Sequence, residues 1–411
     1  MVSDVAFRIG GIAISRSITF ISTLYIASIL PAETWGQISI LINYFMIMLV
    51  FSGNSLSRAV VTFGAQYPEK SLSVVSYVNR INFIAYCIVA FSALIILNLN
   101  FIPLPFIYRK SFLVILSLLL FPLLTQNLIS FCQGQGKVKL MTSLELLRNV
   151  ITAIILIWFI KTNTDSIQGW IDGKYVGIII AFLLIVLIVK LKFSGSMFYW
   201  KIEDVELYKG LKEYFFWALS GALMAVALKN VDVFLVNHFT KSEVYTGEFK
   251  LAMLFFTSFG LFAQSVTSGL HHRIATYYIS PGDLWDFTIQ IKKIVMPIYL
   301  ILALILYFIT DWGIHVLFGN KYIYLSSSLK IIIAASFFQT YSIVNGGVWA
   351  GIGKIKLNSA YFSIYSTVYI ILLIIILHYF GFAYYAYGIL IVSIIGAALS
   401  EYFFRSKTIY L

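Results

Sequence analysis

The sequence predicts an all-α, polytopic membrane protein with about twelve transmembrane helices. Of its 411 residues, 60% are hydrophobic and only 11% are charged. Apolar runs of about 20 residues, long enough to cross the hydrocarbon core of a bilayer as an α-helix, recur along the whole chain. A water-soluble domain cannot bury so much apolar surface, so the helices are expected to lie in lipid.

A seven-residue stretch occurs twice. Residues 134–140 read GQGKVKL and residues 351–357 read GIGKIKL, an offset of 217 (351 − 134) with five of seven residues identical. Each copy lies between two apolar runs. Glycine adopts backbone angles that other residues avoid, so each copy is expected to form a tight turn between two helices. The repeat predicts two equivalent halves of the chain.

Two further residue pairs support this repeat. Gly36 and Gly247 open the second and eighth predicted helices, at an offset of 211 (247 − 36). Arg58 and Arg273 lie near the ends of the same two helices, at an offset of 215 (273 − 58). Near-constant offsets predict two six-helix bundles related by a parallel internal repeat. The predicted domains are an N-terminal bundle at 1–195, a cytoplasmic linker at 196–213 and a C-terminal bundle at 214–411.

Prolines, glycines and polar residues separate the predicted spans. Pro31 ends the first span, and Pro103 and Pro105 stop helix propagation between the third and fourth. The first glycine turn separates the fourth span from the fifth, and the longest polar connection follows the sixth. In the second half, Pro297 is the expected position of any kink. The predicted spans are residues 9–30, 37–61, 81–97, 112–131, 144–160, 175–189, 214–239, 247–270, 294–309, 325–347, 358–380 and 383–404.

The distribution of basic residues predicts the orientation. With the N-terminus inside, the inner loops and tails hold 17 lysines and arginines and the outer loops hold six. Such an excess is typical of cytoplasmic loops, so both termini are predicted to be cytoplasmic. The net charge of +12 is scattered in ones and twos, which argues against a nucleic-acid partner. The six basic residues assigned to outer loops are Arg109, Lys110, Lys161, Lys174, Lys241 and Lys321.

No metal, cofactor or nucleotide site is predicted. The two cysteines lie inside apolar runs, and no spacing of histidines and cysteines matches a metal motif. The glycine–lysine turns lack the strand, the helix and the full pattern of a phosphate-binding loop, so we expect no ATP site.

Charged residues inside the spans are the strongest functional candidates, because each costs about 2.5–3.5 kcal/mol on insertion scales. Arg16 lies in the first span. Lys229 lies near the middle of the seventh, and Asp232 is one turn further on the same face. We predict that Arg16 and Lys229 line a polar cavity and bind an anionic group, and that Asp232 couples transport to an ion. The alternative for Lys229 and Asp232 is an ion pair that only lowers the insertion cost.

Other charged residues have simpler interpretations. Arg58 and Arg273 are predicted to guide an anionic headgroup, although snorkelling to lipid phosphates is the alternative. Three groups are expected to have no role in a site. Glu145 and Arg148 form a local salt bridge, His271 and His272 are an interfacial pair, and near the outer interface the residues that can snorkel are Glu248, Lys250 and Lys330.

Three stretches together resemble a known family. Residues 30–37 (LPAETWGQ), residues 230–236 (NVDVFLV) and the paired glycine–lysine turns resemble the polysaccharide-transporter branch of the multidrug, oligosaccharidyl-lipid and polysaccharide exporter superfamily. Within that branch they are most similar to O-antigen flippases. The resemblance implies a bacterial inner-membrane protein of two six-helix bundles that is a transporter and not an enzyme.

The resemblance also implies a substrate. Such flippases move an undecaprenyl-diphosphate-linked oligosaccharide from the cytoplasmic to the periplasmic leaflet by alternating access. Related flippases direct arginines of the first, second and eighth helices toward the diphosphate, and Arg16, Arg58 and Arg273 occupy those helices here. Membrane lipids, a polysaccharide polymerase and a chain-length regulator are the other partners implied.

Two alternatives remain open. An ion-coupled multidrug antiporter of the same superfamily would prefer cationic substrates and an acidic cavity, whereas the charges inside these spans lean positive. A membrane polysaccharide polymerase would need a sizeable periplasmic loop, and the predicted outer loops are short.

Overall fold

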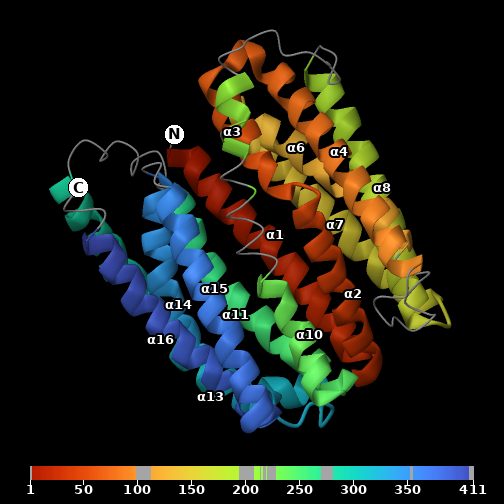
Figure 1. Cartoon of the computed structure of the whole chain (residues 1–411), viewed down its shortest axis with the longest axis vertical. Helices are drawn as coiled ribbons and strands as arrows, with labels where there is room; N and C mark the ends of the chain where they lie inside the picture. The colour runs from red at the N-terminus through yellow and green to blue at the C-terminus, as the bar shows by residue number, and fades with distance from the viewer. Residues whose placement is uncertain are drawn as a thin grey trace. The chain divides into compact units, whose positions relative to one another are not determined.

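The computed structural model describes residues 2–98, 113–193, 208–212, 214–215, 219, 228–269, 281–351 and 355–406, and every regular element within them is helical (Figure 1). The α-helices are α1 (Val2–Ile29), α2 (Ala32–Phe51), α3 (Ser57–Gln66), α4 (Ser71–Asn98), α6 (Leu120–Gly134), α7 (Val138–Thr162), α8 (Ser166–Lys192), α10 (Leu228–Thr240), α11 (Glu243–Gly269), α13 (Pro281–Phe318), α14 (Leu325–Gly351), α15 (Ile355–Tyr379) and α16 (Tyr385–Phe404).

Each of the twelve predicted spans overlaps one of these helices. All the α-helices except the short α3 correspond to the predicted spans in order, and nine helices in the described ranges are long and apolar enough to cross a membrane. The all-α, multi-pass fold class is therefore confirmed. Helix starts were predicted less well: α4 begins at Ser71 and α13 at Pro281, ten or more residues before the predicted 81 and 294.

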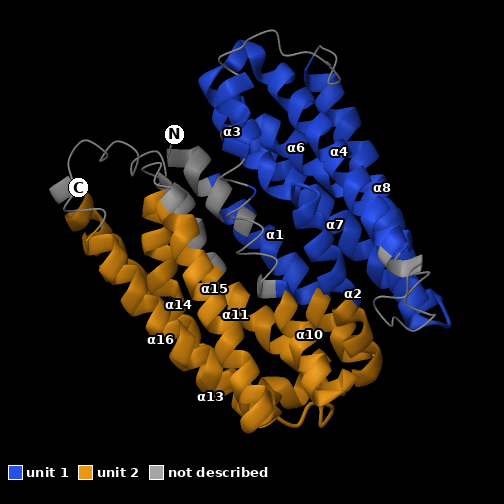
Figure 2. Cartoon of the chain, viewed as in Figure 1, with its two compact units in different colours: residues 1–22, 41–230 blue, residues 23–40, 231–411 orange. Residues whose placement is uncertain are grey.

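The chain forms two compact units (Figure 2). Unit 1 comprises residues 1–22 and 41–230, and unit 2 comprises residues 23–40 and 231–411. Residues 23–40, the end of α1 and the start of α2, thus pack with the second half of the chain. Most of the predicted linker at 196–213 falls outside the described residues, so the predicted domain boundaries stay a prediction.

Helix α2 is shorter than predicted because the chain turns at Gly53. This residue has a φ of 87°, in the left-handed region that glycine tolerates. The buried Asn82 holds the turn: its Nδ2 donates to the carbonyl oxygens of Ser52 and Gly53 at 2.8 and 2.9 Å. The single span predicted over 37–61 is therefore wrong, and Arg58 lies on the separate helix α3.

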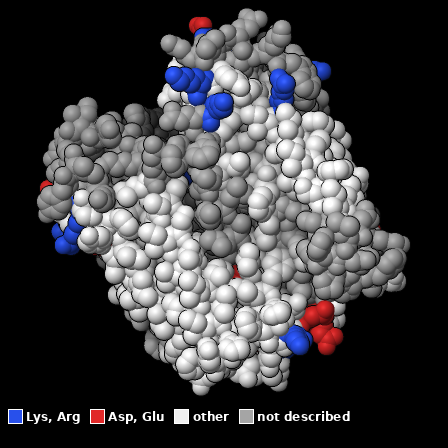
Figure 3. Space-filling model, in the orientation of Figure 1, with Lys and Arg blue, Asp and Glu red and all other residues white. Residues whose placement is uncertain are grey.

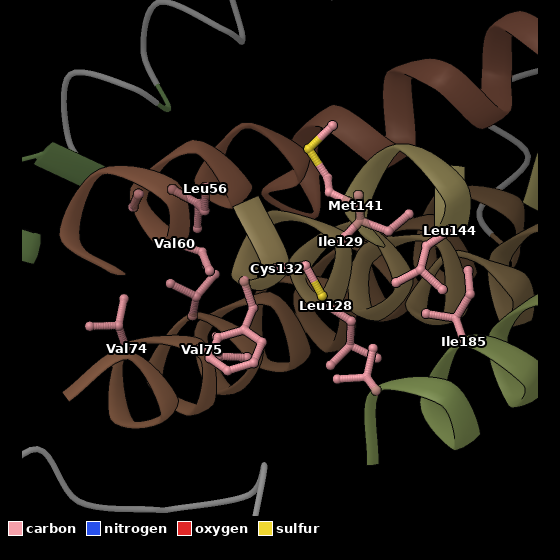
Figure 4. Packing of buried hydrophobic residues seen from close by; sticks show 14 of the residues in the cluster. Leu56, Val60, Val74, Val75, Leu128, Ile129, Cys132, Met141, Leu144 and Ile185 are labelled. Carbon is pink, nitrogen blue, oxygen red and sulfur yellow. The ribbon is translucent and has the colours of Figure 1, made fainter. Parts of the chain in front are cut away.

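The core of unit 1 is made by α3, α4, α6, α7 and α8 (Figure 4). Val60 of α3, Val75 of α4, Cys132 of α6 and Ile185 of α8 are each at most 1% exposed. Small and β-branched side chains at these positions let the helix backbones approach closely, which is the usual way helices associate in lipid.

The first glycine–lysine turn has the predicted structure. Gly136 has a φ of 69°, and the N–H of Lys137 donates to the carbonyl oxygen of Cys132 at 2.9 Å. This pattern ends a helix at a left-handed glycine. The turn is fixed to the start of α4 by Gln135, whose Nε2 donates to Ser71 Oγ at 2.6 Å. In the second copy, residues 352–354 lie outside the described residues.

Residues 23–40 dock on the start of α11 within unit 2. Trp35 is 1% exposed, and its Nε1 donates to the carbonyl oxygen of Gly247 at 3.1 Å. A Cβ placed on Gly36 would lie 1.9 Å from the carbonyl oxygen of Glu243, and one on Gly247 would lie 3.1 Å from the nitrogen of Gly36. The two glycines that the repeat makes equivalent thus pack against each other.

Other turns of unit 2 lie at the same end as this dock. Lys321, between α13 and α14, donates through Nζ to the carbonyl oxygen of Leu30 at 3.1 Å. Phe382, between α15 and α16, stacks on Tyr245 with ring centroids 4.6 Å apart. The sequence predicted that all these turns lie on the outer side of the membrane. The structure agrees that they lie at one end of unit 2. Which side of the membrane that end faces stays a prediction.

The outer surfaces of the helices suit lipid. On α13, Ile294, Ile298, Ile301, Ile305 and Phe308 follow one helical face and are 63, 43, 59, 49 and 77% exposed. In Figure 3, the visible Lys and Arg side chains of unit 1 gather at one end of that unit, and its described flank below them is mostly uncharged. Such an apolar band is expected of a surface that faces the bilayer core.

Lys292 is a structural residue, although the sequence placed it in a cytoplasmic loop. It lies on α13 and is 7% exposed. Its Nζ is 2.9 Å from Glu401 Oε2 on α16 and 3.9 Å from the centre of the Tyr341 ring on α14. The ion pair and the cation–π contact therefore join three helices of unit 2.

We expect Lys292→Ala to lower the free energy of unfolding by about 3 kcal/mol, because among the described residues it leaves the half-buried Glu401 carboxylate with the exposed Arg405 as its counter-charge. The neighbouring Lys293 is exposed, so Lys293→Ala is a matched control expected to change stability by less than about 0.5 kcal/mol. Unfolding of the purified protein in detergent measures both. Equal effects of the two variants would contradict this role.

Candidate functional site

Helix α1 is held against α7 at two places in unit 1. A Cβ on Gly11 would lie 2.0 Å from Cγ2 of Thr142, so the two helices nearly touch there. Further along, Asn149 Nδ2 donates to Ser15 Oγ at 2.7 Å. Because this bond buries Ser15, the next residue, Arg16, lies on the exposed side of α1.

Arg148 on α7 is the second cation of this region. Its Nη1 donates to Gln126 Oε1 at 2.9 Å, and its Nη2 lies 4.0 Å from Glu145 Oε1. The side chains of Arg148 and Glu145 are 26 and 19% exposed. Arg148 also interacts electrostatically with Arg16. The predicted Glu145–Arg148 salt bridge is therefore present, but the same arginine also belongs to a larger group of charges.

Lys174 on α8 is the third cation, and its assignment to an outer loop was wrong. Helix α8 begins right after Asp165, which caps it by accepting from the N–H groups of the second and third helical residues at 2.9 and 3.2 Å. A Cβ on Gly173 would lie 2.9 Å from Cα of Leu156, so α8 packs tightly on α7. Lys174 is half-buried and interacts electrostatically with Arg148.

The sequence contained the signal that was missed. Asp165 followed by Ser166 is a good helix N-cap, and it starts α8 nine residues before the predicted 175. With the helix started there, Lys174 falls within the span. Its electrostatic interaction with Arg148 still depends on the packing of α7 on α8.

We call Arg16, Arg148 and Lys174 the cationic cluster. They come from three helices of unit 1, and Glu145 is the carboxylate paired with them. Three positive charges against one negative charge leave an excess positive potential. Away from bulk water such charges attract a multiply charged anion strongly, and arginine suits phosphate oxygens because its donors form a planar fork.

The other predicted substrate-binding residues do not join this cluster in the described structure. Arg58 is exposed on α3 and interacts electrostatically with Tyr214. The backbone of Lys229 lies in α10, but its side chain is outside the described residues, as is all of Arg273. The predicted roles of these three residues remain predictions.

Asp232, the predicted ion-coupling residue, is 3% exposed on α10 in unit 2. Its Oδ1 accepts from the N–H of Val233 at 2.7 Å, and its Oδ2 accepts from the hydroxyl of Tyr369 on α15 at 3.0 Å. Lys250 of α11 interacts with it electrostatically. The Lys229 side chain is outside the described residues, so its pairing with Asp232 stays a prediction.

Two charged residues of α11, which the sequence placed near the outer interface, are less exposed than snorkelling side chains would be. Glu248 is fully buried and Lys250 is half-buried. Their position near the end of a predicted span made snorkelling plausible. The dock of residues 23–40 covers this part of α11, which hydropathy along the chain does not reveal.

Solved structures with this fold are known transporters. A multidrug resistance MATE family transporter of the MOP superfamily, in an inward-facing conformation, superposes with a TM-score of 0.79 over 96% of this chain and 94% of its own, at 12% identity. The fold is that of a MATE transporter. VcmN, a MATE transporter of Vibrio cholerae, superposes with a TM-score of 0.71 over 99% of this chain and 97% of its own, at 17% identity.

A third structure, an outward-facing conformation of a multidrug resistance MATE family transporter, gives a TM-score of 0.71 over 98% of this chain and 95% of its own, at 14% identity. No protein-family model and no curated protein sequence matches the chain. At these identities the likeness establishes the MATE-like fold over nearly the whole chain and leaves the substrate open.

Proposed function

We propose that this protein is a transporter of the multidrug, oligosaccharidyl-lipid and polysaccharide exporter superfamily that flips an undecaprenyl-diphosphate-linked oligosaccharide. The substrate moves from the cytoplasmic to the periplasmic leaflet of a bacterial inner membrane by alternating access. Both termini are cytoplasmic, and a polysaccharide polymerase and a chain-length regulator are the expected partners. The observation that carries the proposal is the cationic cluster on membrane helices of a MATE-like fold.

The cluster suits a diphosphate for a physical reason. A diphosphate cannot cross hydrocarbon with its charge uncompensated. Arg16, Arg148 and Lys174 can replace its counter-ions in a hydrated cavity while the lipid tail stays in the bilayer. In this proposal Arg58, Lys229 and Arg273 contact the same anion at other stages of transport, and Asp232 couples the movement to an ion.

A multidrug antiporter is the second candidate, because the solved structures with this fold include multidrug transporters. Such a transporter would take cationic substrates, which the cationic cluster repels. A polysaccharide polymerase is disfavoured because the MATE-like fold covers 96% or more of this chain in each comparison cited.

The test is flipping in proteoliposomes. The purified protein is reconstituted with an undecaprenyl-diphosphate-linked oligosaccharide, and a membrane-impermeant glycosidase measures how much headgroup reaches the outer leaflet. We expect the headgroup to become accessible to the glycosidase much faster in vesicles that contain the protein than in protein-free vesicles. In cells, loss of the gene should leave lipid-linked repeat units on the inner leaflet.

Efflux of a cationic dye from the same vesicles distinguishes the alternatives. Dye transport without headgroup flipping would support the multidrug antiporter and contradict our proposal. The polymerase predicts a different result in gene-deleted cells. Lipid-linked repeat units would reach the periplasmic leaflet of the inner membrane at the normal rate but would stay unpolymerised.

A further inference from the structure

Glu248 has an unusual environment in unit 2. It is fully buried near the start of α11, and neither oxygen of its carboxyl group has a hydrogen-bond partner among the described residues. The backbone N–H of Tyr324 lies nearby but outside hydrogen-bond geometry. The hydroxyls of Tyr322 and Tyr385 interact electrostatically with it and also lack hydrogen-bond partners in that part of the chain.

Two cations at this end of unit 2, Lys321 and Lys250, interact with other groups. Lys321, in the turn before α14, donates to the carbonyl oxygens of Ser28 and Leu30. Lys250, two residues further along α11, interacts with Asp232. None of the ion pairs formed between described residues includes Glu248.

The other titratable groups on the elements packed around Glu248 do not neutralise it. Glu243, at the start of α11, carries the same charge and accepts from Gln37 Nε2 at 2.7 Å. From the turn before α14, Tyr322 supplies only a neutral hydroxyl, because burial raises the pKa of Tyr322 well above its usual value. Tyr385 of α16 likewise presents a hydroxyl to the carboxyl group.

An ionised carboxylate without a partner is very costly in a buried site, and such a group takes up a proton instead. A neutral carboxyl group is a different partner, because its O–H donates and its carbonyl oxygen accepts. The Tyr322 and Tyr385 hydroxyls near it can each donate or accept, so neither requires the carboxyl group to be charged. The environment therefore fits the protonated acid and not the ion.

We propose that Glu248 is a proton-binding site, distinct from Asp232, that holds its proton while the turns before α14 and α16 cover the start of α11. Tyr322 lies in the turn before α14 and Tyr385 begins α16, so separation of these turns from α11 would let water reach the carboxyl group. Opening this contact releases the proton, and closing it requires one. This inference applies whatever substrate the protein transports.

Infrared difference spectroscopy of the purified full-length protein in lipid, recorded between acidic and alkaline pH, tests the site directly. We expect a carbonyl band of a protonated carboxyl group that shifts in D2O and disappears in Glu248→Gln. Asp232→Asn should retain the band. If the wild-type protein and Glu248→Gln gave the same carbonyl bands, the proposal would be overturned. This test needs no transport measurement.

Two further measurements keep the test decisive if Glu248→Gln folds poorly. Tyr322→Phe and Tyr385→Phe keep the carboxyl group but remove its neighbouring hydroxyls, so each should shift the band; unchanged spectra in both would contradict the proposed site. Adding sodium at constant pH should leave the band intact. Loss of the band on adding sodium would show a metal cation, and not a proton, as the ligand.

Discussion

Flipping of the lipid-linked oligosaccharide is expected to fall by roughly 100-fold or more when Arg16 and Arg148 are both replaced by glutamine, since each charged hydrogen-bonding group contributes about 1.5–3 kcal/mol. Glutamine keeps polarity and much of the length but removes the charge. Only Lys174 of the cationic cluster would then remain, with Glu145 still opposing the anion. The loss should appear in the proteoliposome assay.

The controls separate charge from folding. Arg80→Gln removes an exposed arginine of α4 in the same unit and should leave flipping unchanged. Arg16→Lys with Arg148→Lys should restore part of the activity. Because loss of Arg148 leaves Glu145 without its arginine, the variant with Glu145→Gln added should be as stable as the wild type and still inactive. Normal flipping in that variant would contradict a role of the cluster in binding.

Gly36→Ala is expected to destabilise unit 2 by about 3 kcal/mol, the upper end of the usual cost of overpacking. A Cβ at this position would lie 1.9 Å from the backbone oxygen of Glu243, and backbone atoms cannot move aside as a flexible side chain can. The dock of residues 23–40 on α11 must therefore shift or separate. The free energy of unfolding in detergent measures this effect.

Gly313→Ala on α13 is the matched control, because the nearest atom to its added Cβ would be 4.0 Å away. Alanine favours a helix over glycine, so this variant should be more stable by about 1 kcal/mol. If Gly36→Ala proved as stable as Gly313→Ala, close approach at Gly36 would not hold the dock together.

The sequence by itself determined the class of the protein and most of its helices. Hydropathy averaged over about 20 residues is a local property, so it located a helix at each of the twelve predicted spans. The turn at Gly136 was predictable for the same reason: it depends on the backbone freedom of one residue. Helix starts were less accurate, as at α8, because the cap at Asp165 lies several residues before the strongly apolar part of the span.

Which charged side chains interact with one another depends on the packing of the helices. Arg16, Arg148 and Lys174 come from three helices, and their proximity depends on the close contacts of α1 and α8 with α7. Glu248 is buried because other turns of unit 2 cover the start of α11. Hydropathy is summed along one chain segment and carries no information about the faces that neighbouring helices present to each other. Contacts between helices distant in sequence therefore had to be seen in three dimensions.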